Sequence, residues 1–388
     1  MNARGAARVR NGHPWIYRSD VVAAEGIAPG AVVCISGPAG KFLGSALYST
    51  ASQIAVRLLT SRRLDGADSL AALLRERIAA AIEYRRRVVA DTDAYRVIFS
   101  EADLLPGLIV DRYNDVLSIQ VLTQAMDDTA VRDLIVHEVA GKFAPEGIVE
   151  RVEERIRELE QLPPRAPALL YGEKTSTVFT MNGVKFQYDA LAGQKTGAFL
   201  DQRKNYRAAA HYARGEALDV FCYQGGFALH LARTCERVSA VDSSRAALEI
   251  ADQNAALNHC EIEWIEANAF DLLKDYAAAG RQYDTIVLDP PAFAKTRRAV
   301  PTAIRGYKEL NLRALKMLRP GGLLVTCSCS YHVSEAEFME MLAAASLDAR
   351  RPLKILERRT QAEDHPILLT VPETQYLKCV LAVVASGE

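Results

Sequence analysis

The segment Leu218–Phe227 (LDVFCYQGGF) constrains the fold of this chain more than any other stretch. It starts as an apolar run, ends in Gly225–Gly226 followed by Phe, and continues into the helix-like sequence ALHLARTC, which is the order strand, glycine turn and helix. A second apolar run, Val238–Val241, follows and ends at Asp242. In an open parallel sheet, ligands bind at the carboxyl ends of the strands, where the strand order reverses. We therefore expect a ligand site beside Gly225–Gly226 and Asp242.

The residue types at this turn narrow the class of ligand. Glycines allow the backbone to approach a ligand closely, and an acid that closes the second strand can accept hydrogen bonds from both hydroxyls of a ribose. The glycines do not fit G-x-G-x-x-G, the pattern that holds a pyrophosphate. A cofactor with a ribose and no pyrophosphate, such as S-adenosylmethionine, therefore fits better than a dinucleotide. In the alternative interpretation, Gly225–Gly226 is only a tight turn and Asp242 only caps the following helix.

A regular alternation of strands and helices continues from Leu218 onward. The expected strands are LDVFC, RVSAVD, IEWIEAN, YDTIVLD and GGLLVTCSC, with helical segments between them. Such alternation favours a parallel sheet in a doubly wound, Rossmann-like α/β domain. Asn268 ends the third strand, where its amide could read the edge of an adenine. A simple strand-end turn residue is the alternative.

The first 63 residues have a different character. They contain short β-like runs at Ala31–Ser36, Phe42–Tyr48 and Ile54–Leu59, broken by glycine and proline, and no run long enough to predict a helix. We expect a small β-barrel over residues 1–63. This part has eight basic residues and two acidic ones, on a chain whose net charge is −1. The local excess indicates either an anionic partner or a solvated surface.

Residues 64–180 predict a central α+β domain. The helical periodicity is clear over Ser69–Val89, and alternating strands are expected over residues 95–124. Residues 153–180 are charged and then rich in proline, and we interpret them as a connection. The Rossmann-like domain is then expected over residues 181–388.

Composition argues against several classes of protein. The seven cysteines contain no C-x-x-C pair, and their spacing suits neither zinc nor a disulfide framework, so we predict no metal site. Their odd number suggests a reducing compartment. The N-terminus has no apolar h-region, and no apolar run approaches the ~20 residues that span a bilayer. We expect a cytoplasmic protein that does not bind membranes, and both a monomer and a homodimer stay open.

Asp289-Pro290-Pro291 ends the fourth expected strand. Proline fixes φ and removes a backbone donor, so the two prolines should hold the carboxylate rigidly at the edge of the sheet, beside the cofactor. Together with Phe293, this motif could grip the exocyclic amino group of a base and stack on its ring. Alternatively, Asp289 could protonate or hydrogen-bond the ring of a pyrimidine under nucleophilic attack. A mere strand terminator is the third interpretation.

Two cysteines at the end of the fifth expected strand distinguish between these chemistries. Carbon-5 of cytosine takes a methyl group only after a thiolate has added to carbon-6, and an activated cysteine is the usual nucleophile for such covalent catalysis. Cys327 lies inside the apolar run, so we expect it to be buried, whereas Cys329 lies at the strand end between Ser328 and Ser330. We therefore predict that Cys329 is the nucleophile and that Asp289 acts with it.

Residues 189–206 (DALAGQKTGAFLDQRKNY) form a loop and the start of a helix ahead of the first sheet strand. Phe199, Asp201, Gln202 and Arg203 lie in the part of this segment that can fold over a bound cofactor. A polar helix N-terminus is the alternative, above all for Asp201.

Seven motifs together resemble one family, the large-subunit ribosomal RNA cytosine-5 methyltransferases with an N-terminal PUA domain. These motifs are LLPGLIVDRY, KTGAFLDQR, LDVFCYQGGFALHLA, LDPPAFAK, RGYKELN, SCSYHVS and DHPILLTVPETQYLKC. The resemblance covers nearly the whole chain. The resemblance implies a PUA domain, a central α+β domain and a class I methyltransferase domain that uses S-adenosylmethionine. It also implies that Cys329 is the nucleophile and Asp289 the carboxylate of the DPP motif. The cofactor-binding residues that it implies are Phe199, Asp201, Gln202, Arg203, Phe221, Tyr223, Gly225, Gly226, Asp242, Ser243, Asn268, Asp289 and Pro290.

The resulting expectation is formation of 5-methylcytosine in large-subunit ribosomal RNA through a covalent adduct between a cysteine and carbon-6. The partner would be ribosomal RNA, naked or partly assembled, with the target base taken into the cleft. Three alternatives stay open. They are methylation of an amino group of adenine or guanine through DPPAF, a non-catalytic RNA-binding protein of ribosome assembly and, least favoured, an NAD dehydrogenase.

Overall fold

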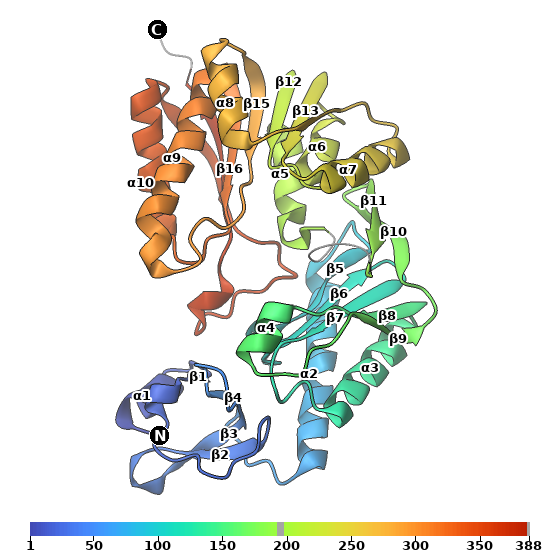
Figure 1. Cartoon of the computed structure of the whole chain (residues 1–388), viewed down its shortest axis with the longest axis vertical. Helices are drawn as coiled ribbons and strands as arrows, with labels where there is room; N and C mark the ends of the chain where they lie inside the picture. The colour runs from blue at the N-terminus through green and yellow to red at the C-terminus, as the bar shows by residue number, and fades with distance from the viewer. Residues whose placement is uncertain (192–197, 386–388) are drawn as a thin grey trace. The chain divides into compact units, whose positions relative to one another are not determined.

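The computed structural model describes residues 1–191 and 198–385 (Figure 1). The chain divides into two compact units. The first unit consists of Met1–Phe179, a segment that begins at Tyr188, and Glu363–Thr374. The second unit consists of Thr180–Gln187, Ala198–Ala362 and a C-terminal segment that begins at Gln375. Both units therefore combine segments that lie far apart in the sequence.

The first unit begins with a four-stranded antiparallel sheet in the order β1-β4-β3-β2. Its strands are β1 (Trp15–Ile16), β2 (Val32–Ser36), β3 (Phe42–Tyr48) and β4 (Val56–Thr60). The three strands predicted in this region are thereby confirmed. Ile16, Ala46 and Ala55 have no exposed surface and lie at the centre of a small core.

A helix, α1 (Ala3–Arg10), precedes this sheet, although the sequence pattern predicted no helix here. The side chain of Asn2 caps it by accepting a backbone hydrogen bond in the first turn. Arg4 and Arg8 bind the fully buried carboxylate of Asp20 at 2.8 and 2.5 Å. Isolated helices of this length are marginal, so contacts with a residue outside the helix stabilise it, and local periodicity does not reveal them.

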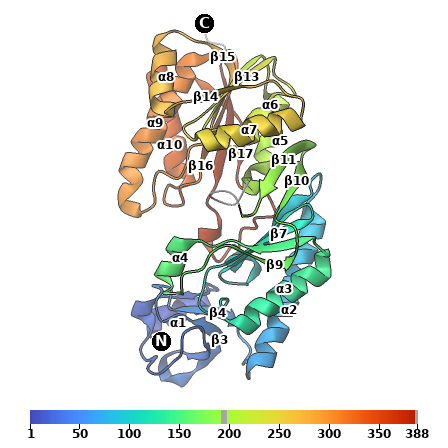
Figure 2. The same ribbon diagram turned by 45° about the vertical axis from the view of Figure 1, so that its right-hand side comes forward.

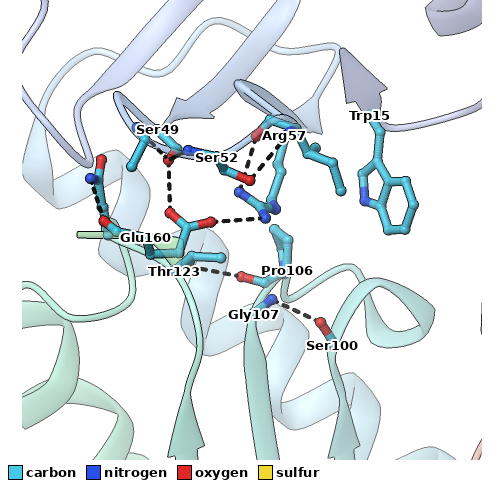
Figure 3. A network of polar contacts seen from close by, with 12 residues as sticks. Trp15, Ser49, Ser52, Arg57, Ser100, Pro106, Gly107, Thr123 and Glu160 are labelled. Carbon is cyan, nitrogen blue, oxygen red and sulfur yellow. Dashed lines mark hydrogen bonds and ion pairs between the residues drawn. The ribbon is translucent and has the colours of Figure 1, made fainter. Parts of the chain in front are cut away.

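Other ion pairs change the interpretation of the basic N-terminal region. Arg57 binds Glu160 at 3.2 Å, and Glu160 also accepts a hydrogen bond from Ser49 at 2.7 Å (Figure 3). Arg62 binds Glu76 at 3.3 Å. With the two arginines of α1, four of the eight basic residues have an acidic partner within the first unit. The local excess of positive charge is therefore partly neutralised inside the protein.

The rest of the first unit contains a five-stranded sheet in the order β5-β6-β7-β8-β9. Its strands are β5 (Ala94–Phe99), β6 (Leu108–Tyr113), β7 (Val116–Val121), β8 (Gly147–Glu150) and β9 (Ala168–Gly172). Its helices are α2 (Ala67–Val88), α3 (Thr129–Phe143) and α4 (Glu154–Leu159). The predicted long helix is confirmed as α2, which buries Leu74, Ile78 and Ile82 at four-residue spacing in the core of this sheet.

The interpretation of residues 153–180 as a connection is wrong. α4 lies in this region, β9 pairs with β8, and β10 (Ser176–Met181) pairs with β11 (Val184–Asp189). β9 depends on pairing with β8, which its charged and proline-rich surroundings do not signal. The turn between β10 and β11 carries Asn182 and Gly183 at φ of 51° and 79°, as a two-residue hairpin prefers.

The second unit is built on a seven-stranded sheet in the order β14-β13-β12-β15-β16-β18-β17. Its strands are β12 (Glu216–Val220), β13 (Arg237–Asp242), β14 (Glu263–Glu266), β15 (Tyr283–Leu288), β16 (Leu318–Ser328), β17 (Leu353–Arg359) and β18 (Lys378–Val384). The first five of these run parallel, and β18 pairs antiparallel with both β16 and β17. The strand order reverses beside β12, which is the expected position of a ligand site.

Helices cover both faces of this sheet (Figures 1 and 2). On one face lie α8 (Ala269–Ala278), α9 (Val300–Met317) and α10 (Glu335–Ala349), and on the other α5 (Arg203–Tyr212), α6 (Gly226–Leu231) and α7 (Arg245–Leu257). α9 buries Ala303, Tyr307, Leu310 and Ala314, whose spacing of three to four residues forms one apolar stripe. The doubly wound α/β fold is confirmed. No helix within the described ranges is long and apolar enough to cross a membrane.

Candidate functional site

Asp242 ends β13 at the carboxyl edge of the sheet, beside the turn that follows β12. One of its carboxylate oxygens accepts a hydrogen bond from the amide of Tyr223 at 3.0 Å, and the other accepts one from the amide of Ser244 at 2.9 Å. The cap of α7 is Ser244, whose side chain accepts a hydrogen bond from the amide of Ala247. Asp242 therefore orders the glycine turn and does not cap the helix. Its neighbour Ser243 is exposed at the same edge.

The turn after β12 has an unusual backbone conformation. Phe221, Tyr223 and Gly225 have φ of 69°, 50° and 86°. Such angles are costly for the two aromatic residues, so the surrounding contacts must enforce them. Gly225 provides conformational freedom, whereas Gly226 is required for packing, because a Cβ there would lie 2.5 Å from the hydroxyl of Tyr206. Glycine is thus required at these two positions for different physical reasons.

Asp219, near the end of β12, is a site residue that the sequence pattern did not identify. It is fully buried, and one carboxylate oxygen accepts a hydrogen bond from the amide of Ala228 at 2.9 Å. The other oxygen has no hydrogen-bond partner among the residues that the structure describes. Burial, reinforced by the charge of Asp289, raises the pKa of Asp219 well above its usual range. A buried oxygen of this kind fits a ligand that brings its own donors, as the amino and hydroxyl groups of S-adenosylmethionine do.

Asn268 lies at the end of the third strand, as predicted, but its side chain is partly engaged. It is the N-cap of α8, and its amide oxygen accepts hydrogen bonds from the backbone of Phe270 at 2.9 Å and of Asp271 at 3.4 Å. The prediction that Asn268 reads an adenine edge therefore rests on its NH₂ group alone. Asn is also a preferred N-cap residue, so the same residue at this strand end is compatible with a helix cap and with an adenine contact.

Gln202 links the segment before the sheet to the DPP motif. Its side-chain amide donates a hydrogen bond to Asp289 at 3.0 Å and accepts one from Asn205 at 2.6 Å. Burial, together with the nearby charge of Asp201, raises the pKa of Asp289 to about 7, although the hydrogen bond from Gln202 opposes this rise. Pro290, the next residue, is buried. Asp289 can therefore exchange a proton near neutral pH, which suits acid–base chemistry.

The other predicted residues of this segment have different surroundings. Asp201 accepts a hydrogen bond from the hydroxyl of Tyr376 at 2.6 Å. Phe199 is partly exposed, with its ring 5.3 Å from that of Tyr223, whereas Arg203 is buried and begins α5. The predicted motif KTGAFLDQR also includes residues 195–197, which lie outside the described residues.

Cys329 follows the last residue of β16, on the strand next to that of Asp289. Its thiol lies 3.9 Å from the carbonyl oxygen of Pro290. Burial and the charges of Asp289 and Asp201 raise the pKa of Cys329 to about 12, while the charge of Lys378 lowers it. The thiol and the DPP carboxylate thus follow neighbouring strands at one edge of the sheet, and their roles in the reaction stay a prediction.

Cys327 is fully buried, which confirms the expectation for this residue. It pairs across the strands with Cys379, and burial raises its pKa well above the ordinary value of a thiol. Cys329, by contrast, is only partly buried. Of these two thiols, Cys329 is the one that a substrate can reach.

A hydroxyl network fixes the backbone around Cys329. The hydroxyl of Ser328 donates to that of Tyr307 at 3.0 Å, and the hydroxyls of Tyr307 and Ser330 lie 2.9 Å apart. Ser330 also accepts a hydrogen bond from the amide of Ala294 at 3.1 Å. This network joins the segments that follow β15 and β16, so that the DPP carboxylate and the thiol keep a fixed geometry.

A small pocket lies at the same edge of the sheet, and half of the residues that line it are aromatic. Its lining includes Phe199, Tyr206, Phe221, Tyr223, Phe227 and Asp289. Ligand pockets typically combine hydrophobic and aromatic side chains with a few polar groups that orient the ligand. The sequence-predicted turn, the segment before the sheet and the DPP motif therefore all contribute to one pocket.

Comparison with known families supports this description. Residues 1–61 match the model of a PUA-like domain, and residues 155–368 match that of an S-adenosylmethionine-dependent methyltransferase. Among solved structures, that of SMU.776 complexed with SAH has a TM-score of 0.84 and 19% sequence identity, covering 99% of this chain and 98% of that chain. A second one, from Streptococcus mutans, has a TM-score of 0.82 and 18% identity, covering 98% of each chain. These structures share the fold.

Close relatives cover almost the full length of the chain. The ribosomal RNA large subunit methyltransferase I of Shewanella denitrificans is 37% identical over 381 residues, which is 95% of each chain. The protein of that name from Aeromonas hydrophila is 38% identical over 377 residues, which is 94% of each chain. The chain is thus a methyltransferase that uses S-adenosylmethionine, preceded by a PUA-like domain, and it belongs to the ribosomal RNA large subunit methyltransferase I family.

Proposed function

We propose that this protein methylates carbon-5 of a cytosine in large-subunit ribosomal RNA through a covalent adduct with Cys329. The choice of RNA is supported by the full-length relatives, which are named ribosomal RNA large subunit methyltransferases. The choice of chemistry is supported by one observation above all. The thiol of Cys329 lies beside Pro290, the residue that follows the carboxylate of Asp289.

The nucleophile is needed because carbon-5 of cytosine does not attack a methyl donor unaided. In the proposed reaction, the thiolate of Cys329 forms a bond to carbon-6, and the ring electrons move toward N3. Asp289 gives a proton to N3, for which a pKa of about 7 is well matched near neutral pH. Carbon-5 then carries the electron density of an enamine and can form a new carbon–carbon bond.

The methyl group comes from S-adenosylmethionine, which when bound supplies an electrophilic methyl on a sulfonium. Asp242 would hold the ribose hydroxyls, and the free oxygen of Asp219 would accept a donor of the same cofactor. The aromatic rings of Phe199 and Tyr223 would exclude water from it. The transfer would leave a neutral thioether in place of the sulfonium. A base then removes the carbon-5 proton, the bond between sulfur and carbon-6 breaks, N3 returns its proton to Asp289, and the thiolate of Cys329 is restored.

The RNA backbone requires positive charge near this site, and the loop after the DPP motif provides it. Lys295, Arg297 and Arg298 are all exposed, and none forms an ion pair within the part of the chain that the structure describes. The amide of Ala294 anchors this loop to the hydroxyl of Ser330, next to Cys329. We infer that the loop binds phosphates beside the target base.

The rival function, methylation of an amino group, is less well supported. It would require the ring of Phe293 to stack on a target adenine or guanine. That ring instead packs 4.8 Å from Tyr307 and 6.0 Å from Phe270, on the core of the methyltransferase sheet. The rival function also leaves Cys329 without a role.

A trapping experiment tests the covalent step. On RNA that carries 5-fluorocytosine, carbon-5 has no proton to lose after methyl transfer, so the adduct should persist. Wild-type protein with S-adenosylmethionine should form a complex with RNA that survives denaturing electrophoresis. The control variant Cys327→Ala should form it as well, and Cys329→Ala should not. A complex of undiminished yield with Cys329→Ala would exclude this nucleophile.

A further inference from the structure

We propose that Lys378 is a positioning residue for Cys329: its ammonium group fixes the backbone that follows the thiol and places a positive charge beside the thiolate. This inference rests on the proposed function of Cys329 as a nucleophile. It concerns a residue on β18, a strand to which neither the sequence pattern nor the family comparison assigned a role in the reaction.

The topology brings Lys378 to the site. It is the first residue of β18, and in the antiparallel pairing of β18 with β16 it lies opposite Ser328, the residue before Cys329. Its side chain is buried, with only 8% of the residue exposed. A buried lysine is uncommon, because removing an ammonium group from water is costly unless other groups compensate.

Three backbone carbonyls provide that compensation. The ammonium donates hydrogen bonds to the carbonyl oxygens of Ser330 at 2.7 Å, Val333 at 2.8 Å and Tyr376 at 2.9 Å. An ammonium has three N–H donors, so all of them are used. Two of the acceptors lie in the turn that immediately follows Cys329. Lys378 thus holds this turn to the sheet in a single arrangement.

The charge of Lys378 is available to the site. Among the residues described, no carboxylate forms an ion pair with it, and the acidic groups that act on it from a distance are Glu335 and Glu337. The carboxylates of Asp289 and Asp201 act against the thiolate of Cys329, and Lys378 is the cation that favours it. Burial lowers the pKa of Lys378 to about 8, so at pH 7 most molecules still carry this charge.

Two substitutions remove the charge of Lys378 and differ in the N–H donors that they keep. Lys378→Met removes both the N–H donors and the charge, and Lys378→Gln keeps N–H donors without charge. Lys354→Met on β17, where the side chain is exposed, is the matched control. The readouts are the rate at which iodoacetamide alkylates Cys329, followed by peptide mass between pH 6.5 and 9.5, and the kcat and KM of methyl transfer. Affinity for S-adenosylmethionine serves as the check of folding.

Loss of the charge should raise the pKa of Cys329, and a rise of one unit lowers the thiolate fraction about tenfold. Both variants should therefore be alkylated about tenfold more slowly at pH 7, and kcat should fall while KM and cofactor affinity change little. The difference from wild type should shrink above pH 8, because the wild-type ammonium loses its charge there. A merely structural role would not produce this pH dependence.

The same experiment can also refute a positioning role for Lys378. If Lys378→Gln binds cofactor normally and both its alkylation profile and its kcat match those of the Lys354→Met control, the inference is wrong. If Lys378→Met does not fold, the comparison of Lys378→Gln with Lys378→Arg decides, because Arg keeps charge and donors. A fully active Cys329→Ala would refute the proposed function instead, and the alkylation rates would still decide what Lys378 does to this thiol.

Discussion

At the scale of single residues, the site depends on charges that are held away from water. Asp289 has a pKa of about 7 because it is buried and lies near Asp201. The pKa of Cys329 rises to about 12 for similar reasons. Both groups are therefore protonated more often than the same groups on a surface. A protonated carboxyl suits the proton donation that we propose for Asp289. The nucleophilic role that we propose for Cys329 instead requires a neighbouring group that favours its thiolate.

The raised pKa of Asp289 predicts a pH-dependent cost in stability. A carboxylic acid whose folded pKa lies above its unfolded value favours folding at low pH, and this contribution is lost as pH rises from about 4 toward 7. Asp289→Asn removes the ionisation, so its Tm should exceed that of the wild type at pH 8 by several degrees. At pH 4 the two should be nearly equal.

The measurement is thermal unfolding at both pH values. Asp252→Asn, an exposed acid on α7, is the control and should not alter the difference between pH 4 and pH 8. If the difference in Tm between Asp289→Asn and the wild type is the same at both pH values, ionisation of Asp289 does not destabilise the folded protein. The same variant should lose about 10²-fold or more in kcat, because it has no proton to give to N3.

The sequence indicated the residues to which we assign the chemistry better than those to which we assign supporting roles. Cys329 and Asp289 belong to short local motifs whose residue types are unusual at strand ends. Asp219 and Lys378 act through an unpaired oxygen and three backbone carbonyls that come from other elements. Such partners are determined by strand pairing and by burial, and neither is visible in a single stretch of sequence.

At the scale of elements, long periodic segments were predictable and short ones were not. α2 has a repeated apolar spacing over many turns, whereas α1 spans eight residues and depends on ion pairs with Asp20. β9 depends on its pairing with β8. Tertiary contacts of this kind override local propensity, which is why a charged, proline-rich stretch still contains a helix and a strand.

The loop after β15 carries a prediction about RNA binding. Replacing Lys295, Arg297 and Arg298 by Gln should weaken binding of single-stranded RNA and lower the slope of log K against log salt by about 2, since each phosphate contact contributes ~0.7. The measurement is a titration of RNA binding over a range of salt concentrations, with cofactor affinity as a check of folding.

A charge-matched control lies at the other edge of the same sheet. Arg237 opens β13, Arg281 precedes β15 and Lys316 precedes β16, all at the amino end of their strands, and all three side chains are exposed. Changing these three to Gln should leave the salt slope close to that of the wild type. Equal slopes for the two triple variants would show that the loop after β15 makes no specific contact with phosphates.

At the scale of the whole molecule, the chain does not fold as a simple series of domains. The segment Glu363–Thr374 lies between β17 and β18 in sequence, yet it belongs to the first unit. Within that unit, buried Arg85 donates to the carbonyl of Asp364 at 2.8 Å, and the side chain of Asp364 accepts from the amide of Arg96 at 2.9 Å. Single boundaries on the linear sequence, such as 63/64 and 180/181, cannot represent a unit that includes a segment from far along the chain. They stay predictions.

The central claim concerns which atom of which base receives the methyl group. The most direct measurement is mass spectrometry of nucleosides from unmodified ribosomal RNA, after incubation with the protein and S-adenosylmethionine labelled in its methyl group. Label should appear in 5-methylcytidine with the wild-type protein and should be absent with Cys329→Ala. Label in a methylated purine would contradict the claim and would make the DPP motif, rather than Cys329, the main element of catalysis.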